Sequence, residues 1–266
     1  MGEGERVNLH PWSDSLKDSA RLFQWMIWPM DVEDFMLNYW EKKPILIRRN
    51  KADYNSSLFS TSQLANIIQN NPVQFGVNLD VTSWDKQHGR QTHNEPGRAW
   101  PSKVWDLYNN GCSVRMLNPQ TYSKTIWSLC AGLQEFFGCF TGSNSYLTPP
   151  STTGFAPHYD DVEVFMVQTE GRKRWKVWKP FDNSHLPRTS SRNYHPNEIK
   201  GEPEIYEIVQ PGDVLYVPRG WIHQGECLCG EHSLHVTIST YQKNAWCDLL
   251  EKIVPQALCR APIHCF

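Results

Sequence analysis

After Gly138 the sequence becomes a series of short segments in which apolar and polar residues alternate, separated by Pro, Gly and Asn residues. Alternation with a period of two is typical of strands that bury one face. The expected strands are residues 143–147, 158–169, 174–178, 206–209, 213–217 and 234–240. Strands this short and this numerous fold as an antiparallel sandwich or barrel, because their apolar faces must be buried against one another.

The part of the chain before Gly138 is richer in helical patterns. Amphipathic periodicity and capping residues predict helices at 31–40, from Ser60 or Thr61 to 69, and at 119–137, and a further helix at 244–254. Strands are expected at 44–47, 73–82 and 112–117, and a polar surface loop at 85–101. The fold class is therefore mainly β with flanking helices. We expect Trp175 and Trp178 to pack in the core rather than to contact a cofactor.

Composition limits the function classes. The chain has 266 residues, 39% of them hydrophobic and 12% aromatic, which suits a globular protein of one large or two small domains. Its formal net charge of -2 and its lack of a basic motif argue against direct nucleic-acid binding. No apolar run is long enough for a membrane span, and no apolar signal sequence begins the chain. Eight cysteines without such a signal predict reduced thiols in an intracellular protein. Because the Cys227–Cys229 pair has no matching second pair, a structural zinc site is not favoured.

His158 and Asp160 form the first candidate site. Residues two apart on a strand point to the same face, so the imidazole and the carboxylate converge. Such a pair alone is more often ordinary polar surface than a metal site.

A second motif strengthens the metal hypothesis. Gly212, Pro218, Gly220 and His223 follow the spacing of the second cupin motif, in which a strand and a rigid corner precede a ligand histidine. Two departures, Cys227 in place of asparagine and His-x-Asp in place of His-x-His, disfavour a small-molecule cupin enzyme. Two histidines and one carboxylate are instead the facial triad of non-haem Fe(II) oxygenases, which leaves positions open for a chelating co-substrate and O2. A purely structural role for His223 is the less favoured alternative.

A co-substrate such as 2-oxoglutarate also needs a cation for its distal carboxylate. Lys173 follows the Glu170-Gly171 turn, and an antiparallel return brings it beside the triad. On the strand at 234–240, His235, Thr237 and Ser239 share one face, which lines a pocket if the fold is a double-stranded β-helix. The residues Asn144, Tyr146 and Thr148 share a face in the same way, and Arg115 points away from its apolar neighbours.

Taken together, these segments resemble a known family. Residues 154–161, 170–173, 218–223 and 232–241, with 75–80, 110–115 and 142–150, are similar to the JmjC ribosomal oxygenases. The likeness covers roughly residues 20–258 and is nearest to nucleolar members described as bifunctional lysine demethylases and histidyl-hydroxylases. It implies a JmjC or cupin-like jelly roll, the double-stranded β-helix.

The resemblance also implies the site residues. The metal ligands, and with them the catalytic centre, are expected to be His158, Asp160 and His223. The 2-oxoglutarate contacts are expected to be Lys173, Asn144, Tyr146 and Ser239. The substrate groove is expected to be lined by Arg115, Tyr146 and His235. The cofactors are then Fe(II), 2-oxoglutarate as co-substrate, and O2.

The implied activity is hydroxylation of a histidine side chain in a ribosomal protein. One alternative is demethylation of histone H3 lysines by the same oxygenase chemistry, which would make the protein a chromatin regulator. Another is a non-catalytic JmjC-like binding protein. The resemblance places the protein in the nucleus and nucleolus, with a ribosomal protein, and in the alternative histone H3, as partner. No membrane association is expected.

The expected organisation has three parts. Residues 1–110 form a helical and strand segment that supports the barrel, 111–258 form the JmjC catalytic domain, and 259–266 form an atypical tail. Family members continue into a helical dimerisation region and a winged-helix domain. We expect this chain to be a truncated form that lacks both regions and the family homodimer.

Overall fold

The computed structural model describes residues 15–181, 186–241 and 245–260. Its helices are α1 (Ser15–Ile27), α2 (Val32–Asn38), α3 (Thr61–Asn70), α4 (Pro101–Asn109), α5 (Lys124–Phe137) and α6 (Trp246–Arg260). The strands before the Gly138 turn are β1 (Ile45–Ile47), β2 (Leu79–Asp85), β3 (Gly89–Thr92) and β4 (Ser113–Leu117). The later strands are β5 (Thr141–Thr148), β6 (Glu163–Gly171), β7 (Lys173–Trp178), β8 (Ile205–Val209), β9 (Val214–Val217), β10 (Ile222–Cys227) and β11 (Ser233–Thr240).

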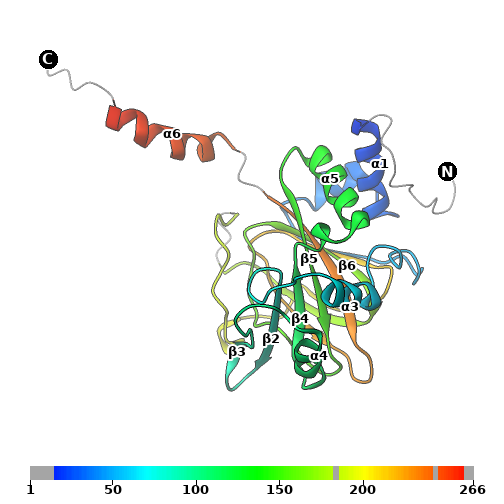
Figure 1. Cartoon of the computed structure of the whole chain (residues 1–266). Helices are drawn as coiled ribbons and strands as arrows, with labels where there is room; N and C mark the ends of the chain where they lie inside the picture. The colour runs from blue at the N-terminus through cyan, green and yellow to red at the C-terminus, as the bar shows by residue number, and fades with distance from the viewer. Residues whose placement is uncertain (1–14, 182–185, 242–244, 261–266) are drawn as a thin grey trace, which may run out of the picture.

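The strands form two antiparallel sheets. The larger has the order β1-β9-β6-β11-β5-β4-β2-β3, and the smaller has the order β10-β7-β8. Helices α1 and α5 lie together against one end of the larger sheet, and α3 and α4 lie along it (Figure 1). This arrangement confirms the expected class, a mainly β jelly roll with flanking helices.

Two apolar clusters occupy the two faces of the larger sheet. Phe165 and Val167 of β6 pack toward the helices, in one cluster with Phe23 of α1 and Leu129 of α5. The residues that alternate with them, Val164 and Met166, pack toward the smaller sheet. Side chains alternate along a strand, so one set on β6 faces the helices and the other faces the smaller sheet. Every residue of β6 from Glu163 to Thr169 is therefore buried.

Helix ends follow the capping signals in the sequence. Asp31 accepts a hydrogen bond from Glu33 N at 2.8 Å, and Ser60 and Gln63 form a capping box at α3. Gly138 ends α5 in the left-handed conformation, at φ 63°. The expected helices at 31–40 and 60–69 are therefore confirmed. The helix expected at 119–137 begins only at Lys124, after a separate 3-10 turn at Pro119–Thr121, because Ser123 caps α5.

Other expectations were wrong in detail. The strand expected at 73–82 begins only at Leu79, because Gly76, at φ 73°, opens a turn before it. The loop expected at 85–101 contains β3, which pairs with β2 as a hairpin. The elements α1, α4 and β10 were also not predicted, and α6 runs past residue 254 to Arg260. No helix of the described residues has the length and apolar character needed to cross a membrane.

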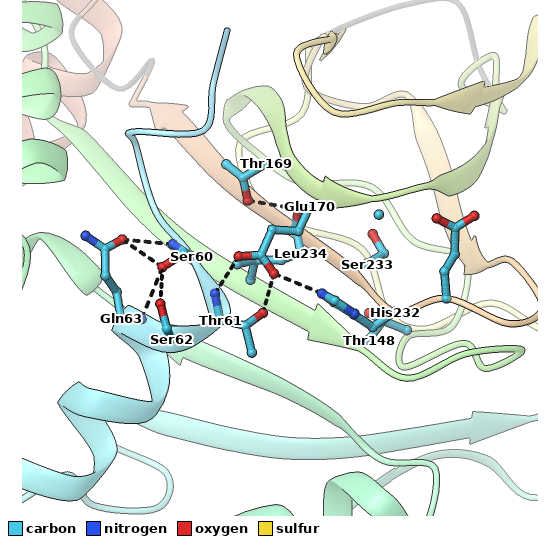
Figure 2. A network of polar contacts seen from close by, with 12 residues as sticks. Ser60, Thr61, Ser62, Gln63, Thr148, Thr169, Glu170, His232, Ser233 and Leu234 are labelled. Atoms are coloured by element: carbon cyan, nitrogen blue, oxygen red, sulfur yellow. Dashed lines mark hydrogen bonds and ion pairs between the residues drawn. The ribbon is translucent and has the colours of Figure 1, made fainter. Parts of the chain in front are cut away.

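A polar network anchors the turn between β6 and β7 (Figure 2). The carboxylate of Glu170 accepts hydrogen bonds from Thr61 N at 2.8 Å and Thr61 Oγ1 at 2.6 Å, and its Oε2 lies 2.9 Å from His232 Nε2. Burial raises the pKa of Glu170, but the hydrogen bonds outweigh it and hold that pKa below its usual value. The start of α3 is thereby tied to the turn that leads into Lys173.

Gly171 completes this turn at φ 56°, with room only for a hydrogen atom: a Cβ there would lie 1.7 Å from the carbonyl oxygen of His232. We expect Gly171→Ala to lower the free energy of unfolding by more than about 3 kcal/mol, because the backbone must move. Gly230→Ala is the matched control, since Gly230 has φ 82° but nothing within 4 Å. It should cost only about 1–2 kcal/mol for the left-handed conformation. Equal losses in urea denaturation would contradict the role of the close contact.

Candidate metal centre

His158 and His223 are joined by an isolated pair of backbone hydrogen bonds. His158 N donates to the His223 carbonyl at 3.3 Å, and His223 N donates to the His158 carbonyl at 2.8 Å. His223 belongs to β10, but His158 and Asp160 precede β6, which begins at Glu163. The expectation that 158–160 lie on a regular strand was therefore wrong. The bridge nevertheless places the two imidazole centroids 4.7 Å apart.

The hydrogen bonds of the two rings assign their tautomers. His158 Nδ1 lies 2.8 Å from the carbonyl oxygen of Ala156, and His223 Nδ1 lies 3.1 Å from that of Trp221. Because a carbonyl can only accept, each Nδ1 carries a hydrogen, and each Nε2 keeps a free lone pair. Metal-binding histidines are commonly oriented by such a bond from the other ring nitrogen.

The carboxylate of Asp160 lies between the two free nitrogens. Its oxygens are 3.9 Å from His158 Nε2 and 3.6 Å from His223 Nε2, and the three ligand atoms lie within 4.8 Å of one another. These separations are too long for good hydrogen bonds and short enough for all three atoms to surround one ion. Burial, and then the neighbouring His158, lower the pKa of His223, which keeps its imidazole in the neutral form that binds a metal.

Backbone contacts position the segment that carries Asp160. Gly220 N donates to the Asp160 carbonyl at 3.0 Å, so the Pro218–Gly220 corner holds the acidic ligand as well as leading to the histidine. The fully buried Glu163 accepts hydrogen bonds from Tyr216 Oη and, at 3.3 Å, from Arg219 N. Burial raises the pKa of Glu163 to about 7. These bonds tie the start of β6 to the end of β9, on either side of the ligands.

The three ligands open into a cavity of about 270 Å³. Most of the residues expected at the site line it, namely Arg115, Asn144, Tyr146, Lys173 and Ser239 together with His158, Asp160 and His223. Trp175 also lines it, which corrects the expectation that this indole only packs in the core; its Nε1 is buried without a hydrogen-bond partner. The alternation on β11 is as expected, since Thr237 and Ser239 face the cavity while Val236 and Ile238 join the helical core.

Lys173 is the buried cation of this cavity. Lys173 is only 3% exposed, and its Nζ donates a hydrogen bond to Thr148 Oγ1 at 2.9 Å. Among the residues that the structure describes, it forms no ion pair with a carboxylate. Burial lowers the pKa of Lys173 to about 8. Opposite this side chain lies Gly225, where a Cβ would come within 2.7 Å of Lys173 Cε.

His235 lies beside the cavity rather than in its lining. Its ring is 2% exposed, stacks on Tyr146 at 4.9 Å between centroids, and meets the ring of Trp175 edge-on at 5.4 Å. Burial lowers the pKa of His235 well below its ordinary value. The strand face was thus predicted correctly, but His235 packs against Tyr146 and Trp175 and is not among the residues that line the cavity.

Several lining residues escaped the sequence reasoning. Arg90 comes from β3, inside the segment expected to be a surface loop, and Phe155 comes from the turn before His158. Ser190, Ser191 and Asn193 approach from a segment without periodicity. The only sequence signal for these residues is that most of them are polar. Polarity does not distinguish residues that line a cavity from residues that are exposed to solvent.

Comparison with known proteins gives one consistent result. A family model described as the JmjC domain matches residues 115–248. Ribosomal oxygenase 1 of Danio rerio is 54% identical, over 92% of this chain and 45% of its own length. Ribosomal oxygenase 1 of Homo sapiens is 49% identical, over 92% of this chain and 38% of its own length. The bifunctional lysine-specific demethylase and histidyl-hydroxylase NO66 of Aedes aegypti is 50% identical over 93% and 39%. The chain thus spans less than half the length of these curated relatives.

Solved structures agree in fold. The structure of Escherichia coli YcfD matches with a TM-score of 0.62 and 21% identity, over 87% of this chain and 58% of that one. A complex described as YcfD, a ribosomal oxygenase, with cobalt and 2-oxoglutarate matches with a TM-score of 0.61 and 20% identity, over 87% and 57%.

Because Lys173 is buried, we expect removal of its charge to stabilise the protein by an amount that depends on pH. The folded protein holds its pKa at about 8, below the ordinary value of 10.5, so the charged amine destabilises the metal-free fold below pH 8. We expect Lys173→Met to raise the free energy of unfolding by about 2–3 kcal/mol at pH 7, and the gain to shrink to nothing as the pH rises from 8 to 10.5.

The measurement is urea denaturation of chelator-treated protein between pH 7 and 10.5. Lys176→Met, at a half-buried position of the same strand, is the control and should show little such change. A gain for Lys173→Met that is absent, or that does not vary with pH, would argue that the amine is solvated.

Proposed function

This chain belongs to the JmjC-domain family, and on that premise we propose that it is an Fe(II)- and 2-oxoglutarate-dependent oxygenase that hydroxylates a histidine side chain of a ribosomal protein. One observation carries the proposal. Two imidazole lone pairs and a carboxylate converge in the same cavity as a buried ammonium group that forms no ion pair among the described residues. A metal site and an anion site side by side are what such an oxygenase requires.

His158, Asp160 and His223 would hold the metal. Both imidazoles are oriented through Nδ1, and the donor set of two nitrogens and one carboxylate suits Fe(II) with open positions rather than a closed zinc site. When bound, Fe(II) supplies the coupling of 2-oxoglutarate decarboxylation by O2 to hydroxylation of a C–H bond.

Lys173 would bind the distal carboxylate of 2-oxoglutarate, with Thr148 Oγ1 beside it. A buried ammonium group destabilises the fold when it has no counter-charge, so a carboxylate that enters the cavity would supply the counter-charge that Lys173 lacks. Asn144, Tyr146 and Ser239 line the same cavity and offer polar contacts, and Val164 and Met166 offer apolar ones. The E. coli structure of the same fold is described as a complex with cobalt and 2-oxoglutarate, in keeping with a 2-oxoglutarate co-substrate.

The charge of the cavity favours histidine over methyl-lysine as the reacting side chain. Arg90 and Arg115 lie 4.6 Å and 5.6 Å from the ring centroid of Phe155. Arg115 is ion-paired with Asp80, whereas Arg90 forms no ion pair with a carboxylate of the described residues. A methylated ammonium would meet this excess positive charge, whereas a neutral imidazole would not. Demethylation of histone H3 remains the second candidate, because relatives such as that of Aedes aegypti are named for both activities.

The remaining assignments follow the same family relationship. We propose that residues 111–258 form the catalytic domain and that residues 1–110 support its barrel, in keeping with the packing of α1, α2 and α3 on the larger sheet. A ribosomal protein is the proposed partner, in keeping with the names of the ribosomal oxygenase relatives. The nucleus or nucleolus is the proposed location.

The direct test incubates the protein with Fe(II), 2-oxoglutarate and histidine-centred peptides that cover the large-subunit ribosomal proteins. We expect succinate and a peptide that gains one oxygen atom, detected by mass spectrometry. Asp160→Ala should abolish both products, because it removes a proposed ligand. Asp85→Ala, at the exposed end of β2, should leave them unchanged.

Formaldehyde release from methylated H3 peptides, with no oxidised ribosomal peptide, would favour the demethylase instead. A folded wild type that forms no succinate at all would contradict the oxygenase proposal and leave the non-catalytic binding protein as the better explanation.

Lys173→Met should also weaken the binding of 2-oxoglutarate about 100-fold or more, because the carboxylate would lose its charge partner in a buried site. Calorimetric titration of the Mn(II)-loaded protein measures this, and Lys176→Met should bind as the wild type does. Unchanged affinity in Lys173→Met would show that the distal carboxylate binds elsewhere in the cavity.

A further inference from the structure

Arg90 is a cavity residue to which nothing above gives a role. It belongs to the short edge strand β3, opposite Trp84 of β2, and its guanidinium carbon lies 4.6 Å from the ring centroid of Phe155. Its Nε is buried without a hydrogen-bond partner, and Arg90 forms no ion pair with any carboxylate of the described residues. The guanidinium thus lies against an aromatic face at the cavity wall and has a hydrogen-bond donor without a partner. A group in this position is suited to bind an acceptor from another molecule.

The neighbouring guanidinium is already engaged. Arg115 forms an ion pair with Asp80 through Oδ2, and Asn94 Nδ2 donates to Asp80 Oδ1 at 2.7 Å. Both oxygens of Asp80 therefore have partners, and Asp80 is only 8% exposed. Because Asp80 is ion-paired with Arg115 and no described carboxylate is ion-paired with Arg90, this wall keeps an excess positive charge.

An aromatic surface connects Arg90 with the metal centre. The ring of Phe155 meets Tyr146 edge-on at 5.3 Å between centroids, and its centroid lies 6.5 Å from that of the His158 ring. The four side chains Arg90, Phe155, Tyr146 and His158 all line the cavity. A flat side chain placed on Phe155 and Tyr146 would therefore lie between a proposed metal ligand and the Arg90 guanidinium.

We propose that Arg90 is a substrate-binding residue that takes an oxygen acceptor of the substrate peptide, either a main-chain carbonyl or an acidic side chain. The inference rests on the proposed function and adds to it the group that holds the peptide while the reacting side chain lies against Phe155 and Tyr146. A planar guanidinium suits this role because it can donate two parallel hydrogen bonds to one acceptor group. The 2-oxoglutarate carboxylate is not its ligand, since that anion has Lys173, which lies on the other sheet.

The test compares steady-state kinetics of wild type, Arg90→Ala and Arg90→Lys on the ribosomal peptide that the wild type oxidises. Arg90→Ala should raise the KM for the peptide about tenfold or more, the loss expected when a charge-assisted hydrogen bond is removed. Its affinity for 2-oxoglutarate and its 2-oxoglutarate turnover without peptide should stay at wild-type values. Arg90→Lys should give an intermediate KM, because it keeps the charge but loses the planar fork.

Arg98→Ala is the matched control. The Arg98 guanidinium also lies on an aromatic ring, 4.3 Å from the centroid of Trp100, and its Nε is also buried without a partner, but it does not line the cavity. It should leave the peptide KM unchanged. Repeating the assay on a peptide with Asn and Gln in place of Asp and Glu distinguishes the two acceptors: the Arg90→Ala effect persists for a main-chain carbonyl and disappears for an acidic side chain.

Two results would overturn the inference while the proposed function stands: equal acceleration of wild type and Arg90→Ala by the peptide, or a weaker affinity for 2-oxoglutarate in Arg90→Ala as the only change. If no peptide accelerates the turnover of 2-oxoglutarate by the wild type, the peptide hydroxylase proposal falls, and this inference falls with it.

Discussion

The central strands of the larger sheet are buried on both faces, and this constraint organises the rest of the molecule. On β6 and β11, alternate side chains belong to two different environments, the helical core on one side and the cavity or the smaller sheet on the other. A shift of register by one residue would move Thr237 and Ser239 into the helical core and Ile238 into the cavity. The packing of α1 and α5 on the sheet is therefore also what sets which polar groups face the proposed metal site.

The metal ligands themselves lie where this regular order ends. His158 and Asp160 precede β6, and three local devices hold them: the two-bond bridge to His223, the bond from Gly220 to the Asp160 carbonyl, and the buried Glu163. Two of these contacts join the segment before β6 to the segment after β9 through backbone atoms, and Glu163 joins the start of β6 to Arg219 through its side chain. The two halves of the site are thus held together, and the Nε2 atoms are oriented before any ion binds.

The sequence predicted the ligand set and the buried lysine well, because each depended on a short local pattern. His158 with Asp160, the spacing that ends at His223, and Lys173 after its turn all occupy one cavity. The strand β10 was missed because Gln224, Gly225 and Glu226 show no alternation of apolar residues. The helix α4 was missed because Trp100 provides no side-chain cap.

Long-range placement was harder to predict than local structure. The period-two pattern put His235 on the cavity face, but whether it lines the cavity or lies behind Tyr146 depends on the size of Tyr146 and Trp175, which come from other strands. Arg90 shows the same limit, because nothing in its own segment indicates that β3 folds back to Phe155.

Gly225 lies opposite Lys173, and because it has no Cβ it leaves space at this end of the cavity. At Gly225 a single methyl group would lie 2.7 Å from Lys173 Cε and 3.1 Å from the ring of Trp175, so the room for the far end of a bound diacid is determined by backbone alone. Position 225 pairs in register with Trp175 on β7 and lines the cavity. A side chain there would have to displace Lys173 or the Trp175 ring, so the space at this end of the cavity depends on a residue that is not a metal ligand.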